Sequence, residues 1–356
     1  MGYYGFDAAN MYGYSTARVK ALEARLLTKA TMQSVLGSKD AEGVMALLLQ
    51  TDYKKDLEAF GGMAMKTEQV DFALSKNLAS SVGKLVTITP VNQRNIIRAI
   101  VGRWDLHNVK LAMDAKEKGE GFDLISRYVI DYGIYNSQAL KEAMREPNVE
   151  SLLARLLINS PYKGIITEAL ETYKKTKSGL EAEIVMDKIY YNNLGAVMMK
   201  LVDIDPESAR VIRMDIDMRN VLLLIRAKRY MMEFAKISQN IINNGTLKPQ
   251  KLQELYNSSK DIESLVKEVK VFDLGRELDA YRRGNAHLLA FEIGMKNQIF
   301  GTSMNLLRHS VLSFGTVLAY SYLKEIEIFT LRIIMNGRRY NLTKEELAGM
   351  IIWRAE

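Results

Sequence analysis

Apolar residues recur along most of this chain at the three- and four-residue spacing of an α-helix. From Ser15 onward, Val19, Leu22, Leu26 and Leu27 follow that spacing with charged residues between them, which predicts an amphipathic helix. Residues that favour helices dominate the composition, and the whole chain contains only 5 Pro. The pattern therefore indicates an all-α protein.

The chain also carries specific signals for helix starts. Thr89-Pro90 and Asp205-Pro206 each place a capping residue before a proline at the first helical position, and both precede long apolar-periodic segments. Thr343 and Glu346 form the pattern of a capping box, which predicts a last helix that extends as far as Trp353.

One helical segment occurs more than once in the sequence. WDLHNVKLAMDAK (104–116) and IDMRNVLLLIRAK (216–228) are 112 residues apart, and both contain an acid followed three residues later by an amide. The identical positions are Asp105, Asn108, Val109, Leu111, Ala115 and Lys116, matched by Asp217, Asn220, Val221, Leu223, Ala227 and Lys228. A weaker third copy is predicted at 324–336, with Glu325 at the position of the acid and Ile328 at that of the amide.

A second marker precedes each copy. Asp71, Asp187 and Asp279 lie in helical segments, and each is followed six residues later by an asparagine. A third marker relates Tyr53 to Tyr162, in similar segments 109 residues apart. Several markers in one order, at a spacing near 110, predict three similar helical domains in tandem.

The expected domains are residues 1–125, 126–245 and 246–356. Their junctions are expected in the polar, glycine-containing stretches 116–121 and 243–249. A chain of 356 residues is long enough for two or three domains.

Composition and charge exclude several classes of protein. Without cysteine there are no disulfides or thiolate metal sites, and the 3 His show no ligand spacing, so no metal is expected. The net charge of +7 is spread along the chain, which disfavours a nucleic-acid partner. The longest uncharged helical run, 310–323, is too short for a bilayer, and the N-terminus lacks a signal peptide pattern. A cytoplasmic monomer is the expectation.

No catalytic constellation emerges from the motifs. The segment 82–85, VGKL, lacks the Ser or Thr of a phosphate loop, and 119–124, GEGFDL, lacks its third glycine, so neither nucleotide nor cofactor binding is expected. His107 matches Arg219 in the repeat and is expected to be exposed. The paired acids Asp203 and Asp205, and Asp215 and Asp217, leave a carboxylate metal site as a minor alternative.

Aromatic residues crowd the N-terminus. They pack on the first domain or, with Arg18, form an interface with another protein, because aromatic residues are enriched at such contacts. The candidates are Tyr3, Tyr4, Phe6, Tyr12 and Tyr14.

The opening YGYSTARVKALEARLL, the repeated helical unit and the closing KEIEIFTLRIIMNGRRYNLTKEEL together resemble the C subunit of the archaeal A-type ATP synthase, whose eukaryotic counterpart is the d subunit of the vacuolar ATPase. The strongest part is the pattern that includes Tyr14, Ala17, Arg18, Val19 and Glu23. The resemblance covers essentially the whole chain.

This resemblance implies a non-catalytic rotor subunit. It implies three domains that form a funnel with approximate threefold pseudo-symmetry, peripheral on the cytoplasmic face of the membrane ring of proteolipid subunits. The central-stalk rotor subunits would enter the funnel, and the chain would couple ATP turnover to ion translocation. A helical scaffold or adaptor unrelated to rotation is the alternative, and an enzyme is the third choice.

Asp217 and Asn220 lie on one side of a helix that is apolar on nearly every side. Such a helix should be largely buried, so the two polar side chains must be hydrogen-bonded. The simpler explanation is a structural bond within each domain, which Asp105 and Asn108 would repeat. The alternative is that the pair lines the socket for the stalk.

Overall fold

The computed structural model describes residues 3–64, 67–131, 133–202, 205–284, 288–310 and 312–352, and for residues 3–9, 64, 67 and 68 it describes the backbone alone. Every regular element in these ranges is a helix, and none is a strand. The chain divides into two compact units, one of residues 95–197 and one of 1–94 with 198–356. The expected junction at about 125 falls inside the first of these units. The all-α class predicted from the sequence is confirmed.

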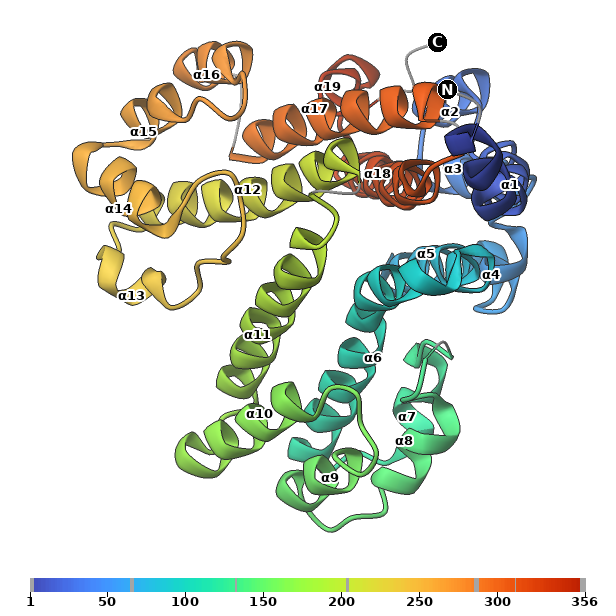
Figure 1. The fold of residues 1–356 in the computed structure, drawn as a ribbon, viewed down its shortest axis with the longest axis vertical. Coiled ribbons are helices and arrows are strands. Elements are labelled where there is room, and N and C mark those ends of the chain that lie inside the picture. Colours follow the sequence, from blue (N-terminus) through green and yellow to red (C-terminus); the bar gives the residue numbers. More distant parts are fainter. Residues whose placement is uncertain are drawn as a thin grey trace. The chain divides into compact units, whose positions relative to one another are not determined.

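The unit of residues 95–197 contains six α-helices in its described part, with a 3₁₀ turn, η3 (Ser126–Tyr128). They are α6 (Arg94–Glu117), α7 (Phe122–Ile125), α8 (Ser137–Ala143), α9 (Val149–Leu156), α10 (Lys163–Thr176) and α11 (Gly179–Met199). The short helices lie beside the two long ones, α6 and α11, as Figure 1 shows. Tyr190 of α11 donates to the carbonyl of Ala99 in α6 at 2.6 Å.

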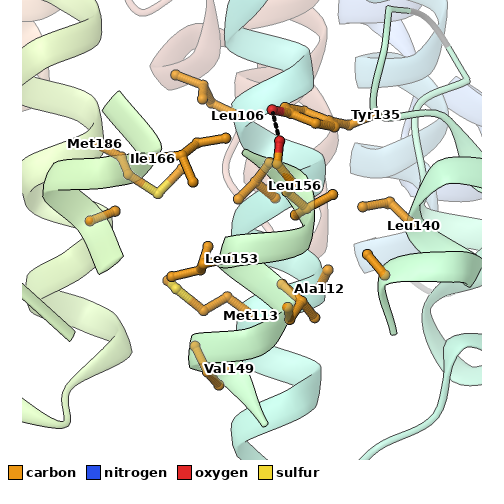
Figure 2. Packing of buried hydrophobic residues seen from close by; sticks show 14 of the residues in the cluster. Leu106, Ala112, Met113, Tyr135, Leu140, Val149, Leu153, Leu156, Ile166 and Met186 are labelled. Atoms are coloured by element: carbon orange, nitrogen blue, oxygen red, sulfur yellow. Dashed lines mark hydrogen bonds between the residues drawn. The ribbon is translucent and has the colours of Figure 1, made fainter. Parts of the chain in front are cut away.

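The core of this unit forms between α6, α11 and the short helices (Figure 2). Leu106, Ala112 and Met113 of α6 are buried against apolar side chains of α8, α9, α10 and α11. These partners are Leu140, Val149, Leu153, Leu156, Ile166 and Met186. Burial of each large side chain contributes about 1.5–3 kcal/mol to folding, so these short helices are stable because they cover α6.

The other unit draws on both ends of the chain. Its N-terminal part holds α1 (Tyr3–Glu23), α2 (Lys29–Gly37), α3 (Ala41–Leu48), α4 (Lys54–Glu58) and α5 (Thr67–Ile88), with the 3₁₀ turns η1 (Gly62–Ala64) and η2 (Val91–Gln93). Its C-terminal part holds α12 (Pro206–Arg229), α13 (Phe234–Ser238), α14 (Pro249–Ser258), α15 (Ile262–Glu268), α16 (Gly275–Arg282), α17 (Leu288–His309), α18 (Phe314–Arg339) and α19 (Lys344–Ala348). Helix α18 packs on α17, α5 and α1, and α17 packs on α12.

The predicted helix starts hold in part. Asp205 caps α12 with Pro206 at the first position, and Thr343 with Glu346 forms the capping box of α19. That helix ends at Ala348, short of the expected Trp353, which lies outside the described residues. Thr89 is no cap, because its hydroxyl donates back to the carbonyl of Leu85 and α6 begins only after η2.

The helix predicted from Ser15 onward also ends early. Helix α1 stops at Glu23, so Leu26 and Leu27 lie in the following loop, although both are buried. Their apolar spacing reflects burial in that loop rather than a continued helical face.

Asp205 accepts hydrogen bonds at the N-termini of two helices. One carboxylate oxygen accepts from the backbone N–H of Ser208 in α12 at 3.1 Å, and the other accepts from the N–H of Gly315 in α18 at 3.1 Å. The N-terminus of a helix carries unpaired N–H groups and a partial positive charge, so a carboxylate is favourable at both.

We expect Asp205→Ala to lower the free energy of unfolding by about 1–3 kcal/mol, since it removes acceptors from two helix starts. Asp40→Ala is the matched control, because Asp40 caps α3 alone, through the N–H of Gly43 at 2.8 Å. Urea denaturation followed by circular dichroism measures both variants. Equal losses in the two variants would contradict the double role of Asp205.

Candidate functional site: a polar motif repeated three times

In the first copy of the repeat, the acid and the amide of α6 bind one loop. The carboxylate of Asp105 accepts from the N–H of Tyr135 and from the hydroxyl of Tyr162, each at 2.9 Å. The side chain of Asn108 donates to the carbonyls of Ile130 and Tyr135 and accepts from the N–H of Ile130 at 3.0 Å. Both polar side chains are buried. They therefore replace the backbone partners that the loop between α7 and α8 lacks.

The second copy repeats this geometry on α12. Asp217 accepts from the N–H groups of Thr246 and Leu247, each at 3.0 Å. Asn220 donates to the carbonyl of Ile242 and accepts from its N–H, each at 2.9 Å. Both side chains are about 1% exposed. The expectation that this pair is buried and hydrogen-bonded is confirmed.

A glycine lies against each of these two acids. A Cβ atom at Gly133 or at Gly245 would lie 2.3 Å from Oδ1 of Asp105 or Asp217 respectively, closer than atoms can approach. The backbone at Gly133 also has a φ of +105°, which disfavours any other residue. Close approach of the loop backbone to the carboxylate therefore requires glycine at this point.

The third copy, on α18, binds a loop from the other end of the chain. Glu327 accepts from the N–H of Leu27 at 2.5 Å and from the hydroxyl of Tyr53 at 2.6 Å. The hydroxyl of Thr330 lies 3.4 Å from the carbonyl of Ile352, which is 22 residues later in the chain. Ile130 and Ile242 follow Asn108 and Asn220 by the same 22 residues.

These contacts correct the register of the third copy. A basic residue eleven positions after the acid donates to a carbonyl of the short helices in each copy: Lys116 to Met144, Lys228 to Ser259, and Arg338 to Leu36. Counted in the same way, the acid is Glu327 and the amide is replaced by Thr330. The sequence comparison placed Glu325 and Ile328 there, two residues too early, because it relied on apolar neighbours that tolerate a shift.

We define a module as one motif helix with the loop and short helices that it binds. Module one is α6 with residues 130–166, module two is α12 with residues 242–261, and module three is α18 with residue 352 and residues 27–53. The resemblance between Tyr53 and Tyr162 follows from this arrangement, since both hydroxyls donate to the acid of their module. In module three, segments from opposite ends of the chain replace one continuous segment.

The second sequence marker is equivalent in two modules only. Asp187 of α11 pairs with Lys110 of α6 at 2.5 Å, and Asp71 of α5 pairs with Arg332 of α18 at 3.2 Å. Lys110 and Arg332 each lie five residues after the acid of their motif helix, so the two ion pairs correspond. Asp279 instead lies on the short helix α16 and pairs with Arg282 of that helix at 3.1 Å.

Burial dominates the electrostatics of the two aspartates. It raises the pKa of Asp105 and of Asp217 above the usual range, while the donors from Tyr135 and Leu247 act in the opposite direction. In module three, Lys324 lies 2.9 Å from Glu327, with 3% and 7% of the two side chains exposed. Burial, followed by the charge of Glu327, raises the pKa of the Tyr53 hydroxyl. These acids are covered by donors from their own loops, so their arrangement suits them to holding structure.

The N-terminal aromatic residues separate into different environments. Tyr12 is buried and hydrogen-bonds with Gln93, whereas Tyr14 is 65% exposed and Arg18 is exposed on the same helix, α1. The side chains of Tyr3, Tyr4 and Phe6 lie outside the described residues. For Tyr12 the packing interpretation holds, while Tyr14 and Arg18 remain candidates for an interface.

Within the described ranges, no group of three or more His, Asp and Glu side chains is arranged to hold a metal ion. In those ranges, too, no helix has the length and apolar character to cross a bilayer. The uncharged run that is too short for a bilayer, 310–323, lies largely in α18, whose first residues, from Phe314 to Ser321, are all buried.

His107 is half-buried, contrary to the expectation of an exposed residue. Burial lowers its pKa, and the nearby charge of Lys110 acts in the same direction, against a hydrogen bond with the backbone of Tyr128. The neutral imidazole is therefore favoured in the folded state.

Acidification below about pH 6.5 should consequently destabilise the fold, because the unfolded chain protonates His107 before the folded chain does. Relative to His107→Gln, the parent should lose free energy of unfolding as the pH falls, at no more than about 1.4 kcal/mol per pH unit. Urea denaturation at pH 7.5, 6.5 and 5.5 measures the difference. A difference independent of pH would show that His107 titrates alike in both states.

We further expect Glu327→Gln to lower the free energy of unfolding by about 1–3 kcal/mol, since it leaves Lys324 without its counter-charge inside the core. Glu325→Gln, two residues away on the same helix and less buried, is the matched comparison and should cost less. Thermal and urea denaturation test the register directly. A larger loss for Glu325→Gln would restore the register predicted from the sequence.

Comparison with known proteins identifies the family of this chain. Residues 15–350 match the family described as ATP synthase (C/AC39) subunit. The chain is 23% identical to the C subunit of the A-type ATP synthase of Thermoplasma acidophilum over 348 residues, which cover 95% of this chain and 97% of that protein. It is 25% identical to the protein of that name from Methanocaldococcus jannaschii, covering 96% and 86% of the two chains, and 28% identical to that from Thermococcus gammatolerans, covering 90% and 84%. The chain therefore belongs to the ATP synthase (C/AC39) subunit family.

Proposed function

We propose that this chain is a non-catalytic rotor subunit of an A/V-type ATP synthase. In this proposal it links the central-stalk rotor subunits to the membrane proteolipid ring, at the cytoplasmic face of the membrane, and transmits torque between ATP turnover and ion translocation. The family match across nearly the whole chain is the observation that carries the proposal, since the relatives it matches are named as the C subunit of an A-type ATP synthase.

The chemistry of the repeated motif is compatible with a mechanical part. A subunit that transmits torque needs rigid loops. Each buried acid binds a loop to a long helix by accepting hydrogen bonds from backbone N–H groups of that loop. Hydrogen bonds to a charged group contribute about 1.5–3 kcal/mol each, more than bonds between neutral groups. We infer that the acids stiffen the modules, and that three modules about one axis, with approximate threefold pseudo-symmetry, offer a socket to the stalk.

Recovery of partners tests the proposal. An affinity-tagged copy of the chain, purified from native membranes in mild detergent, should bring both the stalk subunits and the proteolipid subunits. Recovery of unrelated proteins in their place would favour the alternative, a helical scaffold. The isolated chain, free of other subunits, should show no saturable ATP binding by calorimetry.

We expect the motif to stabilise the fold without contributing to partner binding. Asp217→Ala should lower the free energy of unfolding by about 1–3 kcal/mol, because it orphans the N–H groups of Thr246 and Leu247. Below its unfolding temperature, the variant should still bind the stalk subunits with nearly the affinity of the parent. A variant that melts like the parent but no longer binds the stalk would place Asp217 in the interface.

A further inference from the structure

The three motif helices end in the same backbone turn. In each, an N–H just past the helix donates to the carbonyl five residues earlier: Glu120 to Ala115, Met232 to Ala227 and Leu342 to Gly337, at 2.8, 2.9 and 2.9 Å. The residue before each donor is left-handed, with φ of 70° at Gly119, 50° at Met231 and 59° at Asn341. Glycine and asparagine are the residues that tolerate this conformation, as expected for such a helix end.

Met231 departs from that rule, because it is neither glycine nor asparagine. A left-handed backbone is strained at such a residue, and Met231 is 90% exposed. The preceding Tyr230 is 75% exposed and the following Met232 is 39% exposed. Module one has Lys118 and Gly119 at the positions of Tyr230 and Met231, so the turn forms without these apolar side chains. A strained, protruding apolar group of this kind indicates contact with a partner.

Positive charge surrounds this tip, which we define as residues 230–232. Arg226 and Arg229 lie in the last turn of α12, and Lys236 follows on α13. Glu233 is the one acidic residue between positions 226 and 236. Arg226 approaches Glu292 only at 3.9 Å and keeps 63% of its side chain exposed. The partner that complements this tip is therefore anionic and able to accept apolar side chains.

We propose that the tip of module two binds directly to a membrane surface that carries anionic headgroups. Tyrosine is favoured at the boundary between headgroups and acyl chains, where its ring is apolar and its hydroxyl stays in water. Arginine and lysine next to it attract anionic lipids. Tyr230 and Met231 are largely exposed, so they can enter a headgroup layer without a complementary pocket. This contact is additional to the proposed link with the proteolipid ring.

Vesicles without any protein subunit test the proposal apart from the proposed function. The purified chain is mixed with vesicles of phosphatidylcholine alone or of phosphatidylcholine with phosphatidylglycerol, and bound protein is measured by flotation. The key variant is Tyr230→Lys with Met231→Gly, which places the residue pair of module one on the same backbone. We expect this double variant to bind the anionic vesicles about tenfold more weakly than the parent.

The double variant separates this contact from simple charge attraction, because it adds one positive charge and still should bind less. Tyr14→Lys is the matched control, since it removes an exposed tyrosine of α1 with the same change of charge, and it should bind like the parent. Met231→Gly removes the backbone strain, so circular dichroism should show an unfolding temperature no lower than that of the parent. Arg229→Gln with Lys236→Gln should weaken binding to anionic vesicles.

Three outcomes would overturn the proposal. The parent could bind anionic vesicles no better than neutral ones, or the double variant could bind them as well as the parent. The double variant could also keep vesicle binding and lose the ATP synthase subunits in the affinity purification, which would assign the tip to a protein partner. Failure of the parent to recover those subunits would instead count against the proposed rotor function, whatever the vesicles show.

Discussion

A buried carboxylate on an apolar helix is the constraint around which each module is built. Ionised acids are rarely buried without partners, because removing a charge from water costs several kcal/mol. Asp105, Asp217 and Glu327 are each at most 8% exposed, and each is satisfied by N–H or hydroxyl donors of a loop. The loop in turn lacks a helix or sheet to pair its N–H groups. Neither partner is stable inside the protein without the other, so the acid specifies where the loop must lie.

In module three the buried acid is also satisfied by a loop, but that loop is much farther away in the sequence. The acid and its loop N–H are 30 residues apart in modules one and two and 300 residues apart in module three. For a flexible chain, a tenfold longer loop costs about 2 kcal/mol more in closure entropy. This module also has contacts that strengthen the junction, since Lys324 neutralises Glu327 and donates to Tyr53. The additional charge, on Lys324, occurs in the one module whose acid and loop are far apart in the sequence. We interpret it as compensation for the larger closure entropy.

Helical periodicity and capping chemistry are local, so the sequence revealed the all-α class and the caps at Asp205 and Thr343 correctly. The third motif copy was harder, because its aspartate became Glu327, its asparagine became Thr330, and its partners moved to the other end of the chain. Two spacings survive that change: a basic residue eleven positions after the acid, and an isoleucine 22 positions after the amide or hydroxyl. They identify Arg338 and Ile352 and would have revealed the register. Leu27 could not be found in this way, since its role depends on long-range contact.

The three modules also show which positions the fold leaves free. At positions that stabilise the fold, the three modules have the same residue or one of similar chemistry. Lys116, Lys228 and Arg338 are an example, since all three are basic and donate to a carbonyl. At the exposed tips the same backbone turn carries Lys118 in module one and a tyrosine, Tyr230 or Tyr340, in the other two, and its left-handed position holds Gly119, Met231 or Asn341. Differences among equivalent, unconstrained positions cannot arise from packing, so they mark where the modules meet different surroundings. A repeated protein thus provides its own internal control, and the strained methionine of one tip is informative because its two counterparts do without it.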